Sequence, residues 1–317
     1  MGYSAGDTIL DDEYNTFVNS STDPFGYNHF AGPGAGVYGL NQSTISTVSP
    51  GDTIAASSWN ALFTGLDNIS NHTNVSITSS SVSAGDTIAI RSALVGDLAN
   101  LAAAVAGGST GATALGTNAV GSSTSSATYN TSATIERSVT FANSATMRAF
   151  FNGGGKIRVD PSCVTGIDGD KDTVFNDLTV TAIGNLDIAS LATTRSGSGE
   201  TLTTNGLANG FNDLGTSYTT LIKLTSDNSG YTSNTVEIFA KLNAAPATAT
   251  VITIKCVFTD AADDTTFSSN NLSSVPTNPN EAPKMVLAII EVHPTDAQGL
   301  AAAIQSASNA EVSNSTS

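Results

Sequence analysis

The chain has 317 residues, which predicts about two domains, and hydrophobic residues make up 39% of it, enough for a core. Charged residues make up only 12%, about half of the usual share, and Ser, Thr and Gly fill the gap. The formal net charge of −16 argues against nucleic acid as a partner, because phosphate binding needs a basic surface. No run of about 18 apolar residues occurs, so no membrane span is expected.

The start of the chain and its cysteines indicate where the protein is made. Residues 1–7 have neither a basic n-region nor an apolar h-region, which predicts no secretory signal. Cys163 and Cys256 are too few and too far apart for a disulfide framework, so we expect two small buried thiols. These features predict synthesis in a reducing cytoplasm.

The charged side chains of the first 90 residues are all acidic. They contain eight Asp and Glu residues and neither Lys nor Arg, the first of which is Arg91. An isolated domain of this kind repels itself. Two interpretations stay open, namely docking on a basic partner and a solvated acidic face.

Three copies of one phrase, [Tyr/Val]-Ser-x-Gly-Asp-Thr-Ile, stand in this segment, at residues 3–9, 48–54 and 82–88. The Gly suits a turn that needs positive φ, and the Asp side chain can bond to neighbouring backbone. One carboxylate per turn gives too few ligands for a cation, so we interpret each copy as a structural turn.

Apolar residues at helical spacing follow each copy and predict three helices. The stripe of the second unit covers residues 59–69, and Ser57 or Ser58 could cap the helix. Similar stripes cover residues 94–105 in the third unit and 14–18 in the first. Each unit is therefore predicted to be a turn followed by a helix.

A loop rich in Gly and aromatic residues, 23–39, separates the first two units. It is predicted to be ordered. Its rings either pack on a neighbouring surface or cover the core of their own domain, and the sequence does not separate these alternatives.

Residues 107–133 are almost wholly Gly, Ser, Thr, Ala and Asn and carry no charge, which is the composition of a linker. In an oligomer, such a strip could pair with copies of itself. The chain that follows is rich in β-branched and aromatic runs.

The alternation of apolar and polar residues at 236–242 and 252–258 predicts antiparallel strands with one solvated face. A hairpin turn is predicted at residues 151–156. The eight predicted strands cover residues 138–141, 146–151, 156–160, 178–183, 218–225, 235–242, 250–258 and 285–292.

These patterns predict an α+β, multidomain protein. Residues 1–106 are expected to form a small helical attachment domain of three turn–helix repeats, and residues 107–134 a Gly/Ser/Thr/Ala-rich linker. Residues 135–294 are expected to form an antiparallel β-sandwich that is jelly-roll-like. Residues 295–317 are expected to form a C-terminal helix followed by a polar tail.

Motifs that could carry chemistry are weak. Residues 107–111 match G-x-S-x-G but follow a helix, whereas a nucleophile elbow follows a strand. Residues 153–157 lack the Ser or Thr that follows the Lys of a P-loop, so a β-turn is expected there. His29, His72 and His293 show no zinc-ligand spacing.

Asp168, Asp170 and Asp172 stand at alternate positions. Thr173 and Thr179 occupy the positions where an EF-hand needs Gly and Glu, so the segment is no EF-hand. A looser calcium site stays open beside a solvated acidic loop, and residues 260–264 are interpreted in the same way. No catalytic, cofactor or metal site is therefore assigned, and we predict a protein that is not an enzyme.

Several motifs recur together in this chain. They are Tyr14-Asn15, the loop from Gly26-Tyr27 to Tyr38-Gly39, the turn Gly51–Ile54, the helix Trp59-Asn60-Ala61-Leu62 through His72, and Phe150-Phe151-Asn152-Gly153-Gly154. With these motifs the chain resembles a family of structural proteins from tailed phages that infect cyanobacteria and other marine bacteria. The resemblance covers residues 3–160 well and 215–292 loosely, and the Gly-Asp-Thr form of the turn departs from it.

The resemblance implies a virion structural protein, made in the host bacterial cytoplasm. We expect a homotrimeric appendage of the tail, neck or baseplate, a fibre or fibre adaptor attached through its N-terminal part. The alternative is a capsid decoration (cement) protein on the head lattice. Expected partners are further copies of the chain and other virion proteins, without nucleic acid or membrane. The predicted interface residues are Tyr14, Asn15, Phe25, Tyr27, Tyr38, Trp59 and Asn60.

An enzyme on a tail fibre, a depolymerase or hydrolase, would need paired carboxylates in a β-solenoid, and the sequence has no such repeat.

Overall fold

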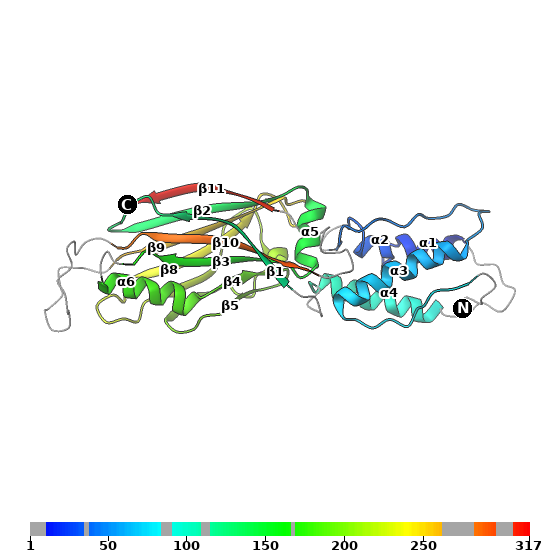
Figure 1. The fold of residues 1–317 in the computed structure, drawn as a ribbon, viewed down its shortest axis with the longest axis horizontal. Helices are drawn as coiled ribbons and strands as arrows, with labels where there is room; N and C mark the ends of the chain where they lie inside the picture. The colour runs from blue at the N-terminus through cyan, green and yellow to red at the C-terminus, as the bar shows by residue number, and fades with distance from the viewer. Residues whose placement is uncertain are drawn as a thin grey trace. The chain divides into compact units, whose positions relative to one another are not determined.

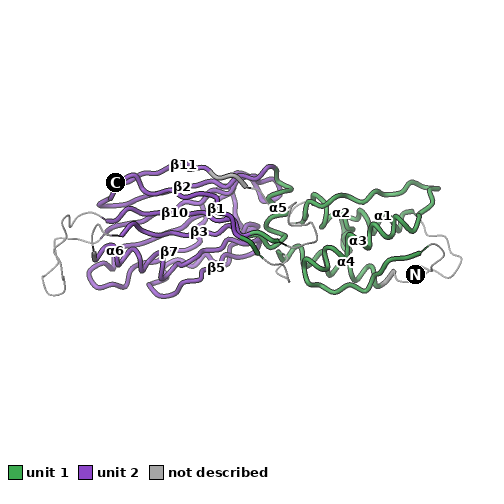
Figure 2. The backbone as a smooth tube through the Cα atoms, in the orientation of Figure 1, with its two compact units in different colours: residues 1–116, 143–155, 293–305 green, residues 117–142, 156–292, 306–317 purple. Residues whose placement is uncertain are grey.

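The computed structural model describes residues 11–34, 38–83, 91–108, 115–165, 169–261, 282–295 and 307–317. The chain divides into two compact units, coloured separately in Figure 2. Unit 1 comprises residues 1–116, 143–155 and 293–305, and unit 2 comprises residues 117–142, 156–292 and 306–317. The fold combines helices with two antiparallel sheets, as Figure 1 shows.

Three helices of unit 1 lie where the apolar stripes predict them: α1 (Asp11–Asn19), α3 (Ala56–Thr73) and α4 (Arg91–Ala106). Two further helices were not predicted, namely α2 (Tyr27–Phe30) within the loop 23–39 and α5 (Ser144–Asn152). Buried aromatic and aliphatic residues of α1 to α4 form one core. No helix within the described ranges is long and apolar enough to cross a membrane.

The turn of the second repeat has the predicted chemistry. Gly51 has a φ of +90°, and the Asp52 carboxylate accepts a hydrogen bond of 2.9 Å from the Ser49 N–H. The turns of the first and third repeats lie outside the described residues. The predicted serine cap is wrong, because α3 begins at Ala56 and its N-cap, Ala55, makes no side-chain hydrogen bond.

The strand predicted at residues 146–151 is wrong, because this segment is helix α5. Asn143 caps it by accepting a hydrogen bond of 2.9 Å from the Thr146 N–H. Every residue from Thr146 to Asn152 is buried, and the apolar residues Met147, Phe150 and Phe151 stand at helical spacing, which the strand prediction overlooked. Gly154 (φ +89°) follows the end of this helix, so residues 151–156 form a helix end instead of a hairpin turn.

Unit 2 contains most of the two sheets. The five-stranded sheet has the order β1 (Leu115–Thr124), β10 (Met285–Pro294), β3 (Lys156–Cys163), β4 (Leu186–Ile188) and β5 (Thr193–Arg195). The six-stranded sheet has the order β11 (Ala307–Thr316), β2 (Ser132–Phe141), β9 (Val251–Thr259), β8 (Thr235–Leu242), β7 (Thr219–Thr225) and β6 (Thr201–Asn205).

Strands β8 and β9 have the predicted alternation of buried and partly exposed residues. Ile238 lies opposite Cys256, and both side chains are fully buried. The strands from β6 to β9 are consecutive in the chain and pair as neighbours, so they form a meander within one sheet.

The strand predicted at residues 178–183 is wrong as well. Helix α6 (Gly169–Asn176) continues into a π-helical turn, η1 (Asp177–Ile183), which packs against β3, β7 and β8. Leu178, Thr179, Ala182 and Ile183 are buried, which is a helical spacing. The β-branched composition favours a strand, but packing against the sheets decides the conformation. A short 3-10 turn, η2 (Phe211–Asp213), follows β6.

Two polar segments are strands instead of the predicted linker and tail. Leu115–Thr124 is β1, so residues 107–134 are not a linker throughout. Ala307–Thr316 is β11, which pairs with β2, whereas residues 296–306 of the predicted C-terminal helix lie outside the described residues. Both strands have mostly polar residues, because a backbone ladder needs no apolar side chains at a sheet edge. The predicted sheet domain, 135–294, also includes α5, which belongs to unit 1.

Candidate functional site

Aromatic side chains from α1 and α3 form the centre of unit 1. The rings of Tyr14 and Trp59 meet edge to face, with centroids 5.2 Å apart, and Phe63 stacks on Trp59 at 5.9 Å. Tyr14, Trp59 and Tyr27 are 1%, 2% and 5% exposed. These three predicted interface residues therefore lie in the core of unit 1.

Asn15 and Asn60 bind extended backbone to the helices that carry them. The Asn15 side chain donates to the Val48 carbonyl at 2.8 Å and accepts from the Val48 N–H at 2.9 Å. Asn60 makes the same pair of bonds with Val82, at 2.9 Å and 2.8 Å. Val48 and Val82 each begin a copy of the repeated phrase. Each asparagine therefore connects the helix of one repeat to the start of the next.

The third repeat has Leu94 at the position of Asn15 and Asn60, and this leucine is buried in the core. Other side chains make comparable bonds to the extended segments that lie between the helices. Asn28 both donates to and accepts from the Ile45 backbone, with 2.8 Å in each case. The Asp97 carboxylate accepts from the Ser79 N–H at 2.8 Å. Polar side chains thus supply hydrogen bonds that an extended segment cannot obtain from a strand partner.

Phe25, His29 and Tyr38 form a partly exposed aromatic cluster. The His29 ring stacks on Phe25 at 4.4 Å with an interplanar angle of 6°, and Tyr38 lies 4.8 Å from both rings. Burial lowers the pKa of His29 below 6.5, which favours the neutral imidazole. Of the seven predicted interface residues, Phe25 and Tyr38 are the aromatic ones that stay partly exposed.

Helix α5 holds the Gly-rich loop. Arg148 donates to the Pro33 carbonyl at 2.8 Å, and Asn152 donates to the Gly39 carbonyl at 3.1 Å. His72, near the end of α3, lies 3.0 Å from the Gly153 carbonyl through its Nε2. The described parts of the loop therefore pack on their own unit. Three motifs that carry the resemblance meet at these contacts.

The two weak nucleotide and nucleophile motifs have no supporting geometry among the described residues. Residues 153–155 follow a helix and precede strand β3, which is the reverse of the strand–loop–helix order of a P-loop. Of the G-x-S-x-G match, Gly107 and Gly108 are described and follow the end of α4, whereas residues 109–111 lie outside the described part.

The acidic residues that could bind calcium are only partly described. Asp170 and Asp172 lie in the first turn of α6, whereas Asp168, Asp263 and Asp264 lie outside the described residues. Within the described residues, no group of three His, Cys, Asp or Glu side chains could hold a metal ion. The calcium site at Asp168, Asp170 and Asp172 stays a prediction.

Both cysteines are free thiols, and Cys256 is fully buried, as expected. Cys163 is partly buried, and this burial raises the pKa of its thiol to about 11. Since the thiolate is the nucleophile, Cys163 is unreactive near neutral pH.

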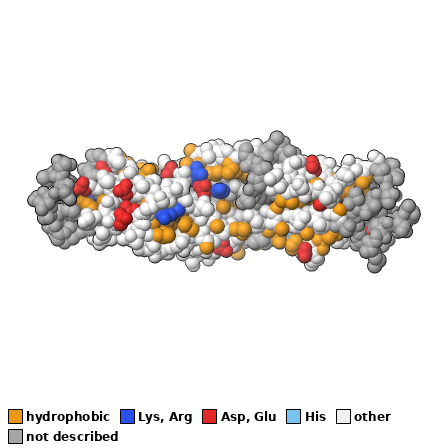
Figure 3. Space-filling view, turned by 90° about the horizontal axis from the view of Figure 1, so that it is seen from below, with side chains coloured by type: hydrophobic (Ala, Val, Ile, Leu, Met, Phe, Trp, Pro, Cys, Tyr) orange, Lys and Arg blue, Asp and Glu red, His pale blue; other side chains and the backbone are white. Residues whose placement is uncertain are grey.

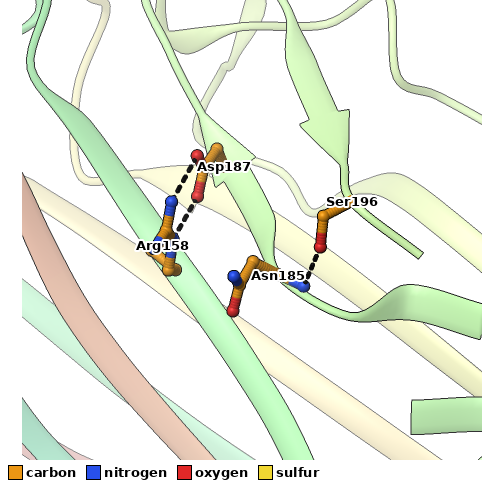
Figure 4. Close-up of polar contacts among 4 residues, drawn as sticks. All are labelled: Arg158, Asn185, Asp187 and Ser196. Atoms are coloured by element: carbon orange, nitrogen blue, oxygen red, sulfur yellow. Dashed lines mark hydrogen bonds and ion pairs between the residues drawn. The ribbon is translucent and has the colours of Figure 1, made fainter. Parts of the chain in front are cut away.

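Figure 4 shows a charged pair on the five-stranded sheet. Arg158 of β3 donates through Nε and Nη2 to the two carboxylate oxygens of Asp187 on β4, at 2.7 Å and 3.0 Å. These bonds raise the pKa of the Arg158 guanidinium. Beside the pair, the Asn185 N–H donates to Ser196 Oγ at 2.8 Å. The pair connects neighbouring strands. Its bidentate geometry lets the guanidinium and the carboxylate neutralise each other within the sheet.

The surface drawn in Figure 3 carries few charged side chains, with broad uncharged areas between them. Among the described residues, the large hydrophobic side chains that are exposed come from separate elements: Leu115, Val164, Val180, Leu191 and Val312. Such isolated exposed residues are normal for a protein surface and mark no binding site.

Comparison with known proteins yields no relative: no family model, no curated protein and no solved structure matches the chain.

Proposed function

We propose that this protein is a non-enzymatic structural subunit of a tailed-phage virion. It forms a homotrimeric appendage of the tail, neck or baseplate that attaches through its helical part. The observation that supports this proposal most is the set of groups to which the motif residues bond. Asn15, Asn60, His72 and Asn152 all bond to backbone groups of their own unit, as structural motifs would.

We also propose two finer features of the fold. The helical part is built from three turn–helix repeats, and the two sheets form a jelly-roll-like β-sandwich. The asparagine bonds from one repeat to the next support the first statement. The second is supported by the bond from Arg137 of β2 to Ser123 of β1, which connects the two sheets.

The aromatic cluster Phe25, His29 and Tyr38 is the surface that we assign to contacts between subunits. It combines ring area with low charge, and aromatic residues are enriched in the cores of protein interfaces. At the three-fold axis of a homotrimer, identical copies present the same cluster to one another without placing like charges together.

The assembly is tested by native mass spectrometry of the full chain at micromolar concentration. We expect a trimer that the double variant Phe25→Ser, Tyr38→Ser weakens. Val312→Ser, an exposed residue of β11, serves as the control and should leave the trimer intact. A wild-type chain that stays monomeric would contradict the trimeric assembly.

The place in the virion is tested by the copy number in purified particles. An appendage is present in far fewer copies than the major capsid protein. Abundance equal to that of the major capsid protein would overturn the appendage and favour the capsid decoration protein.

A further inference from the structure

A lysine and an aspartate meet in the interior of unit 2. Lys171 Nζ of α6 lies 2.7 Å from Asp260 Oδ2, and the two side chains are 0% and 1% exposed. Asp260 directly follows β9, and its own N–H donates to the Thr131 carbonyl at 2.9 Å, which fixes the backbone that carries the carboxyl group. Burying two ions so completely is costly, which favours the neutral amine and carboxylic acid.

Aromatic and thiol side chains are buried in the same region as this pair. Phe175 lies one helical turn after Lys171 on α6 and is fully buried, and its ring centroid lies 6.0 Å from that of Tyr129. Cys256, on the buried face of β9, is fully buried as well. Because the side chains of Lys171 and Asp260 are almost fully buried, solvent has little access to the amine and the carboxyl group.

A group able to carry protons lies in the same buried region as the pair. Tyr129 is 2% exposed, and its hydroxyl has no hydrogen-bond partner among the described residues. Burial raises the pKa of this hydroxyl well above its usual value, so it stays protonated. A buried hydroxyl of this kind can relay a proton without carrying charge itself.

We propose that Lys171 and Asp260 become joined by an isopeptide bond, which makes a covalent cross-link between α6 and the end of β9. Proton transfer within the pair first gives the neutral amine and the carboxylic acid. Nζ then attacks Cγ of Asp260, the C–N bond forms, and the C–O bond to the hydroxyl oxygen breaks. That hydroxyl leaves with one amine proton as water, and the Tyr129 hydroxyl relays this proton. The step needs no oxidant, metal or nucleotide.

Proximity makes this condensation feasible. Two groups held in contact react as if each were present at an effective concentration of about 10⁵–10⁸ M. Both groups are already held in contact in the fold, and the closed site gives water little access for the reverse reaction. The cross-link does not depend on the virion role of the protein.

The chain offers an internal control of the same chemistry. Lys223 Nζ lies 3.4 Å from Glu237 Oε2, but these side chains are 35% and 21% exposed. Water reaches this pair and competes for its polar atoms, so we expect the pair to stay unlinked. A link at Lys223 as well would show that contact alone, without burial, is sufficient.

The test is the intact mass of the denatured full chain, compared with that of Lys171→Arg. We expect the wild-type mass to be lower than its sequence mass by one water molecule, and the variant to keep its full mass. Peptide mapping should show no cleavage after Lys171 and a branched peptide that contains Asp260. A succinimide elsewhere also removes water, but it would persist in Lys171→Arg and would give no branched peptide.

Asp260→Asn supplies a second signature, because an amide condenses with the loss of ammonia instead of water. We expect its mass to fall by one ammonia molecule, with the same branched peptide. Tyr129→Phe should slow the appearance of the link without changing the product. A folded wild-type chain of full sequence mass, with Lys171 in an unbranched peptide, would overturn the proposal, whatever the variants do.

Discussion

The two units satisfy their extended backbone in different ways. In unit 2, strands β2, β8 and β9 bond to one another through continuous ladders, and their side chains are left for packing. In unit 1, the segments before the repeats bond to side chains of the helices, above all to Asn15 and Asn60. The comparison shows that a single well-placed amide can replace a strand partner, and that its loss should then be felt at one defined backbone position.

The largest effect should come from the two cores. Trp59→Ala should destabilise unit 1 by about 3–5 kcal/mol, and Phe258→Ala, on the buried face of β9, should do the same to unit 2. Calorimetry should show two transitions, each lowered by only one of the variants. A single transition that both variants lower would break the comparison, because the units would then unfold together.

Arg148→Gln tests whether α5 belongs to unit 1. It removes a charged donor to the Pro33 carbonyl, which we expect to cost about 1.5–3 kcal/mol. The unit 1 transition should fall, and proteases should cleave more readily near residues 33–40. Arg195→Gln is the matched control, because Arg195 donates to the Ala182 carbonyl at 3.0 Å within unit 2. If Arg148→Gln lowered the unit 2 transition instead, α5 would be assigned to the wrong unit.

Asn60→Ala tests the role of the asparagine amide. It leaves the N–H and carbonyl of Val82 without their side-chain partner, so we expect a loss of about 1–2 kcal/mol in unit 1. Hydrogen exchange at the Val82 amide should accelerate. Asn71→Ala, on the same helix but exposed, should change stability by less than about 0.5 kcal/mol. An unchanged rate of hydrogen exchange at the Val82 amide would argue against the hydrogen bonds between Asn60 and Val82.

A smaller effect is expected for the ion pair between Arg158 and Asp187 in unit 2. A double-mutant cycle of Arg158→Ala and Asp187→Ala should give a coupling energy of about 0.2–1 kcal/mol, because both side chains are partly solvated. High salt should reduce this coupling. A value of several kcal/mol would mean that side-chain pairs matter to unit 2 as much as its ladders do.

The smallest effect concerns pH. Because burial lowers the pKa of His29, the unfolded chain binds a proton more readily than the folded one. Its contribution to the stability of unit 1 should be complete above pH 6.5 and should decrease as the pH falls below this value. His29→Phe keeps the stack with Phe25 and should remove this decrease in the unit 1 transition. An unchanged pH profile in the variant would assign the effect to other groups.

Hydrophobic periodicity predicted the amphipathic elements of both units. The stripes at 59–69 and 94–105 and the alternation at 236–242 each face a core on one side only, so their period is visible in the sequence. Of the candidate site, the repeats marked the positions of Asn15 and Asn60. Their actual partners, Val48 and Val82, could not be inferred, because the bonds run between a helix and a segment distant in the chain.

The missed elements share a different property. Helix α5 and the η1 turn each carry apolar residues at helical spacing, but both are short, and the β-branched residues of η1 favour a strand by composition. The Asn143 cap and the glycines after Asn152 were further local signals for α5. Strands β1 and β11 carry mostly polar side chains, and only their pairing with β10 and β2 makes them strands.

By itself, the sequence determined which segments have one apolar face, how low the charge is and where the repeats stand. These follow from local composition and spacing. The tertiary structure alone decided that three distant motifs meet around Arg148 and Asn152, and that Lys171 lies against Asp260. Such contacts depend on how far separated segments pack, and the pattern within any single segment does not encode that arrangement.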